Sequence, residues 1–206
     1  MHWLLVALAF ALGSIPFGYL LYRWFRGGDI RASGSGNIGA TNVLRTAGKR
    51  LGIATLVLDA AKGWVALWLA LQWRGSGAAV LVAACLLAVI CGHIFSPWLK
   101  GRGGKGVATA LGAFLALAPV ALAGAVIVFL VVLAGWRYVS LASVCAAAAL
   151  PLLLLGMWLD GGGVAGIVVA AAGAAAVLII WRHGGNLERL RLGTESKLGT
   201  RAGRTA

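Results

Sequence analysis

Long apolar segments alternate with short polar ones along most of the chain. The apolar segments cover about residues 3–24, 51–73, 77–96, 106–136, 139–158 and 163–181. A helix needs about 20 apolar residues to cross the hydrocarbon core of a bilayer, and a helix satisfies its own backbone polar groups there. The pattern therefore predicts an all-α fold, a polytopic integral membrane helix bundle that forms a single domain over residues 1–206.

Prolines interrupt two of these segments. Pro16 should kink the first segment, because proline removes a helical hydrogen bond. Residues 106–136 are long for one span and short for two, since one span needs about 20 residues. We expect two short or tilted passes that meet near Pro119. The chain would then have seven transmembrane helices.

The basic residues favour this seven-helix topology. With the N-terminus outside and the C-terminus inside, sixteen of the 18 basic residues fall on the cytoplasmic side. They lie in residues 23–50, 97–106, 137–138 and 182–206. Arg74 then faces outward, and Lys62 lies within a span. A single pass through the Pro119 region would instead put the basic tail outside, against the positive-inside trend.

The composition excludes a soluble protein. Hydrophobic residues make up 61% of the 206 residues and charged residues only 11%, against about 25% charged in soluble domains. The net charge of +13 fits basic cytoplasmic loops near anionic lipid, and no motif of nucleic-acid binding accompanies it. Cys85, Cys91 and Cys145 lie in apolar segments without metal-ligand spacing, so we expect neither a metal nor a cofactor.

Residues 34–45 form an unusually polar segment in this apolar chain. Its glycines, short polar side chains and single arginine are the components of an anion site. The letters match Gly-x-Gly-x-x-Gly, but no buried strand precedes them, which argues against a dinucleotide site. If residues 39–50 form a helix, Thr41 and Arg45 share a face, and Asn37 would share it with Thr41 if the helix began one turn earlier. Arg45 can bind a phosphate with two hydrogen bonds. The candidate ligands are Ser35, Gly36, Asn37, Thr41, Asn42 and Arg45.

A glycine-rich basic segment follows at residues 100–106. It is not a Walker A loop, because Leu99 stands where the first glycine belongs. Lys105 opens the next apolar helix, and a cation at a helix N-terminus is unfavourable unless an anion lies there. Lys105 is therefore the better candidate phosphate ligand and Arg102 the weaker one.

Two charged residues, Asp59 and Lys62, lie inside the second apolar segment. Charged residues within a span are functional or paired, and the three-residue spacing favours an ion pair within one helix. A catalytic role for Lys62 stays open. His93 lies in an apolar segment and is expected to be structural.

Further polar residues follow the apolar segments near the C-terminus. Ser140 and Ser143 begin a helix, so they either cap it or contact a substrate. The tail after the last span holds the histidine with the most polar neighbours, His183. It also contains Asn186, Arg189, Glu195 and Lys197. An exposed tail without function is the alternative.

Three segments together resemble a known family. Ser35-Gly-Asn-x-Gly-x-Thr-Asn-x-x-Arg45, Lys100-Gly-Arg-Gly-Gly-Lys-Gly-Val-Ala-Thr109 and His183-x-x-Asn-x-x-Arg-Leu-x-x-Gly-x-Glu-x-Lys197 are similar to the three motifs of the PlsY-type acyl-phosphate:glycerol-3-phosphate acyltransferases. Arg137-Tyr-Val-Ser140 also fits. The resemblance implies a seven-helix enzyme of the bacterial inner membrane. It implies acyl transfer from acyl phosphate to the 1-hydroxyl of glycerol 3-phosphate, giving lysophosphatidate and phosphate, the first step of phospholipid synthesis.

The residue inventory suits such chemistry. An acyl phosphate already carries a good leaving group, so the site needs charge stabilisation more than a strong acid. We hypothesise direct attack by the glycerol hydroxyl without a covalent acyl-enzyme, with His183 or a substrate phosphate oxygen taking the proton. Arg45 and Lys105 would stabilise developing charge. Ser35 is grouped with these catalytic candidates, although no Asp-His pair that would make it a nucleophile is evident.

The expected partners are the two substrates, membrane lipid and a soluble enzyme that makes acyl phosphate, but no nucleic acid. The main alternative is a membrane transporter of a phosphorylated metabolite. Against it, the polar motifs gather on one face, whereas a transport path needs polar lining at the midplane. A metal-dependent CDP-alcohol phosphotransferase is disfavoured, because five acidic residues are scattered along the chain.

Overall fold

The structure, a computed structural model, describes residues 3–73 and 75–199. The topological expectations for Arg74, Arg201 and Arg204 therefore lie outside the described residues. Within the described part every regular element is helical. In chain order the elements are α1 (Trp3–Ser14), α2 (Phe17–Arg26), η1 (Ile30–Ala32), α3 (Ala40–Ala47), α4 (Lys49–Leu71), α5 (Ala78–Ile94), η2 (Pro97–Leu99), α6 (Val107–Leu117), α7 (Pro119–Trp136), α8 (Val139–Leu159), α9 (Gly166–Arg182) and α10 (Gly184–Arg191).

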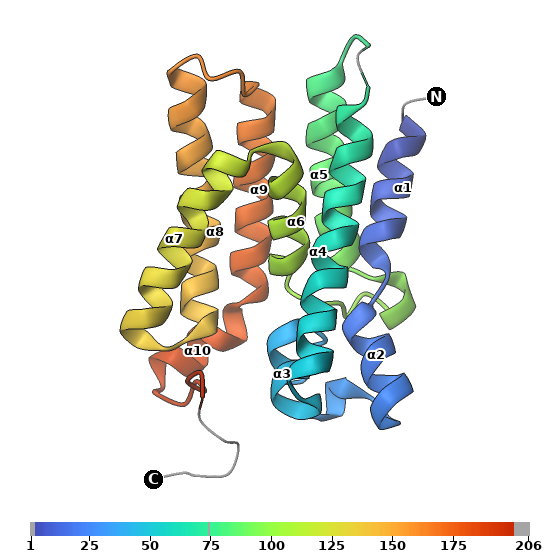
Figure 1. Ribbon diagram of the computed structural model, residues 1–206, viewed down its shortest axis with the longest axis vertical. Helices are drawn as coiled ribbons and strands as arrows, with labels where there is room; N and C mark the ends of the chain where they lie inside the picture. The colour runs from blue at the N-terminus through green and yellow to red at the C-terminus, as the bar shows by residue number, and fades with distance from the viewer. Residues whose placement is uncertain (1–2, 74, 200–206) are drawn as a thin grey trace.

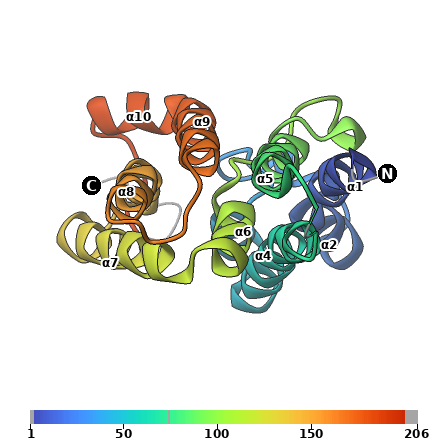
Figure 2. The same ribbon diagram turned by 90° about the horizontal axis from the view of Figure 1, so that it is seen from above.

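The long helices stand side by side in two groups (Figures 1 and 2). One group contains α1, α2, α4 and α5, and the other contains α7, α8 and α9, with α10 at the lower end. The short helix α6 packs closely on α4, and α5 packs on α9 to join the groups. Helix α1 begins at the upper end of the bundle, whereas α10 lies at the lower end (Figure 1).

The segments that contain Pro16 and Pro119 are both broken where the sequence indicates, whereas Pro151 lies inside the continuous helix α8. Helix α1 ends at Ser14 and α2 begins at Phe17, directly after Pro16. Helices α6 and α7 are separated by Ala118 alone, and Pro119 occupies the first position of α7. Proline is well tolerated at that position because its missing N–H has no helical acceptor there. The apolar stretch over residues 106–136 therefore forms two helices.

The described helices match an integral membrane bundle. Five helical segments are long and apolar enough to cross a membrane, or six if α9 and α10, bent by 54°, count as one. Helix α6 has 11 residues, which gives a length of roughly 16 Å at a rise of 1.5 Å per residue. That length falls short of the hydrocarbon core of about 30 Å, so α6 alone does not reach across.

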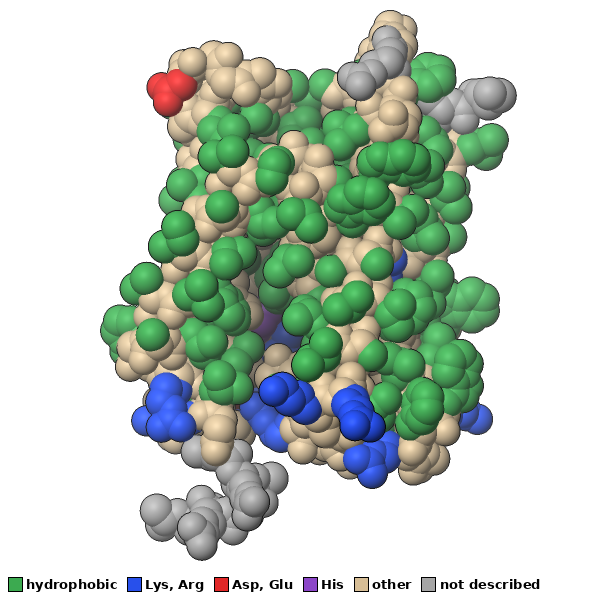
Figure 3. Space-filling view, in the orientation of Figure 1, with side chains coloured by type: hydrophobic (Ala, Val, Ile, Leu, Met, Phe, Trp, Pro, Cys, Tyr) green, Lys and Arg blue, Asp and Glu red, His purple; other side chains and the backbone are tan. Residues whose placement is uncertain are grey.

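Lysine and arginine side chains gather at the lower end of the molecule, whereas its sides are covered by hydrophobic side chains (Figure 3). A lone acidic side chain marks the upper end in this view. The apolar sides suit contact with lipid chains, because soluble proteins rarely expose such large apolar surfaces. The basic end suits the polar surface of a membrane.

Glycines let α4 and α6 pack backbone against backbone. A Cβ atom at Gly63 of α4 would lie 2.0 Å from the Thr109 carbonyl oxygen of α6. A Cβ atom at Gly112 of α6 would lie 1.7 Å from the Ala60 carbonyl oxygen of α4. Small residues allow such close approach, which drives helix association in membranes because lipid offers no hydrophobic gain.

We therefore expect Gly112→Ala to lower the thermal unfolding midpoint of the purified protein in detergent. Forcing a methyl group into a tight interface costs about 1–3 kcal/mol. Gly135→Ala is the matched control, because nothing in the described part of the structure lies within 4 Å of a Cβ atom there. Equal midpoints for the two variants would contradict this account of the α4–α6 interface.

Candidate active site

A cavity of about 510 Å³ lies between the two groups of helices. Figure 3 shows a hollow there, with a histidine and a cationic side chain at its lower end. Polar side chains surround one part of it. They belong to Ser35, Asn37, Thr41, Asn42, Arg45, Lys105, Ser140, Ser143, His183, Asn186 and Glu195. The remaining wall is mostly apolar and includes Leu111, Phe114, Val126, Phe129 and Leu150. One cavity thus joins a polar site to an apolar groove.

The first wall of the polar part is the loop before α3, and Asn42 organises it. The Asn42 Oδ1 accepts a hydrogen bond from the Ser35 N–H at 2.9 Å. Its Nδ2 donates to the backbone carbonyls of Ser33 at 3.0 Å and Asn37 at 2.8 Å. The Asn42 residue is only 2% exposed. Its side-chain hydrogen bonds thus go to the loop itself. Gly36, with φ +70°, allows the turn but does not line the cavity.

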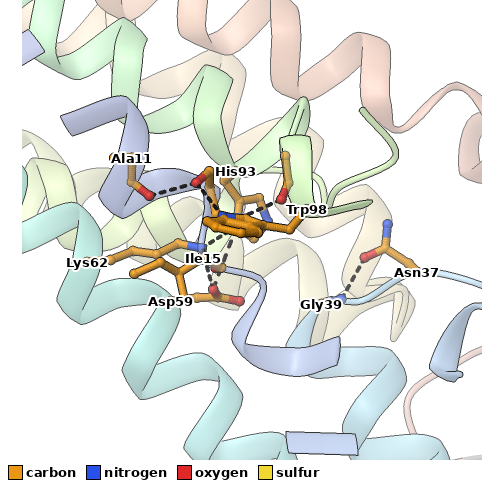
Figure 4. Close-up of polar contacts among 10 residues, drawn as sticks. Ala11, Ile15, Asn37, Gly39, Asp59, Lys62, His93 and Trp98 are labelled. Carbon is orange, nitrogen blue, oxygen red and sulfur yellow. Dashed lines mark hydrogen bonds and ion pairs between the residues drawn. The ribbon is translucent and has the colours of Figure 1, made fainter. Parts of the chain in front are cut away.

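Thr41 and Arg45 lie one turn apart on α3, and both line the cavity. The helix is shorter than the expected segment over 39–50, because Gly48 adopts φ +93° and breaks it before Lys49. Asn37 precedes the helix and shares no helical face with Thr41. Its Oδ1 instead accepts a hydrogen bond from the Gly39 N–H at 2.8 Å, at the start of α3 (Figure 4).

The second wall is the glycine loop that leads into α6. The Gly104 N–H donates to the His93 carbonyl at 3.0 Å, and the Gly103 N–H donates to the Ile94 carbonyl at 3.0 Å. Arg182 donates to the carbonyls of both glycines, at 3.3 Å and 3.2 Å. These bonds hold the loop against the end of α5, so that Lys105 lines the cavity. Arg102, the weaker candidate, is exposed and lies outside the cavity wall.

Glu195 connects the third wall. Its Oε1 accepts hydrogen bonds from Ser140 Oγ at 2.9 Å and Asn186 Nδ2 at 2.7 Å. Its Oε2 accepts from Arg189 Nε at 2.7 Å. Burial alone would raise the pKa of Glu195, but these three hydrogen bonds outweigh it and the pKa is lowered. Glu195 is therefore ionised at neutral pH.

Lys105 joins the second and third walls. Its ammonium donates a hydrogen bond to Asn186 Oδ1, and Asn186 donates in turn to Glu195. Burial lowers the pKa of Lys105 from its ordinary value of 10.5 to about 8. The charge of Glu195 opposes this shift, whereas nearby arginines, including Arg45, add to it. A buried cation among other cations is a place where a bound anion would be stabilised.

His183 is 2% exposed and lines the cavity, so the alternative of an exposed tail does not hold for this residue. Its Nδ1 lies 2.7 Å from the Ile179 carbonyl oxygen. A carbonyl oxygen only accepts, so Nδ1 carries the hydrogen, and in the neutral ring Nε2 is free to accept a proton. The bend between α9 and α10 places this ring beside the cavity.

The two serines of α8 do not cap their helix. Tyr138 occupies the N-cap position without a side-chain hydrogen bond, Ser143 Oγ donates to the Val139 carbonyl at 2.8 Å, and Ser140 donates to Glu195. Both serines line the cavity. Arg189 and Lys197 do not: Arg189 pairs with Glu195, and the Lys197 ammonium lies 5.6 Å from the centroid of the Tyr138 ring.

Sequence reasoning missed two further residues of the cavity wall, Asp59 and His93. The expected ion pair within α4 is confirmed, with Lys62 Nζ 2.7 Å from Asp59 Oδ1. The contact of Lys62 with His93, at 2.9 Å, was not anticipated. The available signal was that an ammonium group has three N–H donors and one carboxylate rarely satisfies all of them.

Comparison with known proteins covers nearly the whole chain. A sequence profile of the family described as glycerol-3-phosphate acyltransferase matches residues 3–193. The glycerol-3-phosphate acyltransferase of Syntrophotalea carbinolica is 46% identical over 95% of this chain and 96% of its own length. That of Myxococcus xanthus is 46% identical over 94% of this chain and 97% of its own length.

Solved structures agree with the sequence comparison. A crystal structure of PlsY (YgiH), an integral membrane glycerol 3-phosphate acyltransferase, in its glycerol 3-phosphate form has a TM-score of 0.87 and 37% identity, covering 97% of this chain and 96% of that one. The lysophosphatidic acid form of PlsY has a TM-score of 0.84 and 36% identity, with the same coverage.

Lys105 should react with a small amine-acylating reagent as a group with an apparent pKa of about 8. Reaction rates measured by peptide mass spectrometry across pH would give this value, because only the neutral amine reacts. Glu195→Gln removes a charge that raises the Lys105 pKa, so the midpoint should fall further below 8. An unchanged or higher midpoint in Glu195→Gln would contradict the coupling of the two groups.

Proposed function

This chain belongs to the glycerol-3-phosphate acyltransferase family, and on that premise we propose that it transfers an acyl chain from acyl phosphate to the 1-hydroxyl of glycerol 3-phosphate. The products would be lysophosphatidate and inorganic phosphate. The observation that carries this proposal is the joining of a cation-rich polar site to an apolar groove in one cavity. Such a cavity suits a donor with a phosphate head and a long acyl tail.

The donor's tail would lie in the apolar groove between α6, α7 and α8. Phe114, Phe129 and Leu150 belong to the wall of this groove, and burial of apolar surface contributes about 25 cal/mol per Å². The phosphate and the reacting carbonyl would then lie at the polar part, near Lys105. The related PlsY has a crystal structure in a lysophosphatidic acid form, which supports a lysophosphatidate product for this chain.

Both substrates carry phosphates, and the polar part offers cations and N–H groups for them. Arg45 and Thr41 present a guanidinium and a hydroxyl from one helical face, and Ser35 lies in the loop before it. Lys105 lines the same cavity, beside Asn186. Two cations in one cavity suit two anions that must approach each other, because they reduce the repulsion between the phosphates.

The reaction needs no acyl-enzyme. The glycerol hydroxyl oxygen forms a bond to the acyl carbon, and the bond from that carbon to the phosphate oxygen breaks. The hydroxyl proton goes to His183 Nε2 or to a substrate phosphate oxygen. Lys105 and Arg45 stabilise the charge that develops on the acyl oxygen and on the leaving phosphate. No metal or other cofactor enters these steps.

The same proposal includes a topology of seven passes with the N-terminus outside. The first pass is α1 with α2, followed by α4, α5, α6 together with the glycine loop that precedes it, α7, α8 and α9. This path would put the basic lower end of the molecule, and with it the active site, on the cytoplasmic face of the bacterial inner membrane. A soluble enzyme that makes acyl phosphate could then deliver it from the cytoplasm.

The orientation can be measured with single cysteines in a variant whose native cysteines are replaced by alanine. In sealed inside-out vesicles, Arg102→Cys should react with a membrane-impermeant thiol reagent and Asp160→Cys should not, because the two lie at opposite ends of the proposed topology. Right-side-out vesicles provide the control. The reverse pattern would rule out the proposed orientation.

The reaction itself is tested with the purified protein in detergent micelles. Acyl phosphate and glycerol 3-phosphate together should give lysophosphatidate and phosphate in equal amounts without added metal. Lys49→Ala is a suitable control variant, since this exposed lysine lies outside the cavity. Phosphate release that does not depend on glycerol 3-phosphate would refute the proposed transfer.

The role of His183 is tested in the same assay. If Nε2 accepts the hydroxyl proton, His183→Ala should lower kcat by more than about a hundredfold while KM for glycerol 3-phosphate changes little. A variant whose main defect is a raised KM would exclude the base role. In that case the substrate phosphate oxygen would be the remaining acceptor.

A further inference from the structure

Three ionisable side chains, Asp59, Lys62 and His93, are buried in one polar layer inside the bundle, with exposed fractions of 1%, 4% and 4%. The Lys62 ammonium lies 2.7 Å from Asp59 Oδ1, 2.9 Å from His93 Nδ1 and 2.8 Å from the Ile15 carbonyl oxygen (Figure 4). The contacts with His93 and Ile15 are hydrogen bonds, and the contact with Asp59 is an ion pair. Buried charges within a span are costly and usually functional.

The lysine fixes the state of the histidine. Because an ammonium group only donates, His93 Nδ1 accepts, and the neutral ring carries its hydrogen on Nε2. Nε2 faces the backbone of Gly104: a Cβ atom at Gly104 would lie 2.1 Å from it. The imidazole ring therefore packs directly on the residue that precedes Lys105.

The other end of the layer reaches the break between α1 and α2. The helix is interrupted at Pro16, and the Ile15 carbonyl beside this break accepts hydrogen bonds from the Phe17 N–H at 3.2 Å and from Lys62 at 2.8 Å. The neighbouring Ser14 is bonded as well: its carbonyl accepts from Ser96 Oγ at 2.6 Å, and its Oγ accepts from Trp98 Nε1 at 3.0 Å. The layer thus connects the broken first helix, α4 and the end of α5, from which the glycine loop starts.

We propose that Asp59, Lys62 and His93 are positioning residues for acyl transfer, which set the place of Lys105 in the cavity through the contact of His93 with Gly104. This inference rests on the proposed function. Asp59 and Lys62 hold the His93 ring, the ring and the His93 carbonyl hold Gly104, and Gly104 carries Lys105. A displacement of about 1 Å in a catalytic group can cost roughly a hundredfold in rate.

A purely structural ion pair would have similar contacts, so the test must separate folding from positioning. Lys62→Met alone leaves a buried carboxylate without its partner, which is strongly destabilising, and it can fail to fold for that reason. Asp59→Asn with Lys62→Met removes both charges and keeps the shapes. If the pair only supports folding, this double variant should regain activity together with stability.

We expect the thermal unfolding midpoint of the double variant to lie within a few degrees of that of the wild-type protein. Its kcat should fall at least about tenfold, whereas its KM for glycerol 3-phosphate should change less than threefold. The apparent pKa of Lys105 from amine labelling should rise, because a displaced loop returns the lysine to water. The matched control is Glu188→Gln with Arg191→Met, which removes an exposed ion pair of the same i, i+3 spacing. This control variant should keep the wild-type kcat and the wild-type apparent pKa of Lys105.

Gly104→Ala tests the contact from the loop side and leaves the ion pair intact. Its methyl group would meet His93 Nε2, so the loop must shift, and kcat should again fall at least about tenfold with little change in KM. Gly173→Ala is the matched control, since nothing in the described part of the structure lies within 4 Å of a Cβ atom there.

The activity of the wild-type protein distinguishes a failure of the proposed function from a failure of the positioning role. A wild-type protein that does not acylate glycerol 3-phosphate overturns the proposed function, whatever the variants do. If the wild-type protein is active, a kcat within threefold of wild type in either Gly104→Ala or the folded double variant overturns the positioning role. A double variant that does not fold leaves Gly104→Ala to decide.

Discussion

The structure depends on keeping a charged lysine at the buried junction of three separate chain segments. Water stabilises an ammonium group strongly, and its removal is costly unless hydrogen bonds and opposite charge replace it. Lys105 receives that replacement from Asn186, and through Asn186 from Glu195. The arrangement leaves the cation only partly compensated, since burial still lowers its pKa to about 8. A bound phosphate would complete the compensation, and we therefore propose that an anion binds beside Lys105.

The cost of removing an ammonium group from water also explains why each of two buried lysines in this apolar chain is surrounded by polar groups. At Lys62 the protein itself provides an ion pair with Asp59 and hydrogen bonds with His93 and the Ile15 carbonyl. At Lys105 the protein provides less, and the cavity opens beside it. We interpret the first cluster as a fixed support and the second as the reactive group. The loop with Gly103 and Gly104 connects the two clusters, because it packs on His93 and leads directly to Lys105. Only glycine permits such close contact with His93 at these two positions.

The sequence predicted the helical membrane fold well, because apolar length and proline breaks are local signals that lipid enforces. It also identified most of the polar cavity wall, since Lys105, Arg45, His183 and Asn186 stood out in an apolar chain. It could not show that the Asn42 side chain forms its hydrogen bonds within the preceding loop, because these depend on how that loop folds. It also could not show that His93 contacts Lys62, because the two lie on different helices. The sequence predicted a break near Pro119, but it did not show that the helix before this break has only 11 residues.

The proposed reaction requires that one cavity holds a phosphate at Lys105 and an acyl chain in the adjoining groove. The most direct measurement is an experimental structure of this protein with a non-reactive analogue of acyl phosphate. We expect the phosphate oxygens within hydrogen-bond distance of Lys105 Nζ and the tail between α6, α7 and α8, beside Phe114 and Phe129. A phosphate bound away from Lys105, or a tail outside this groove, would contradict the claim.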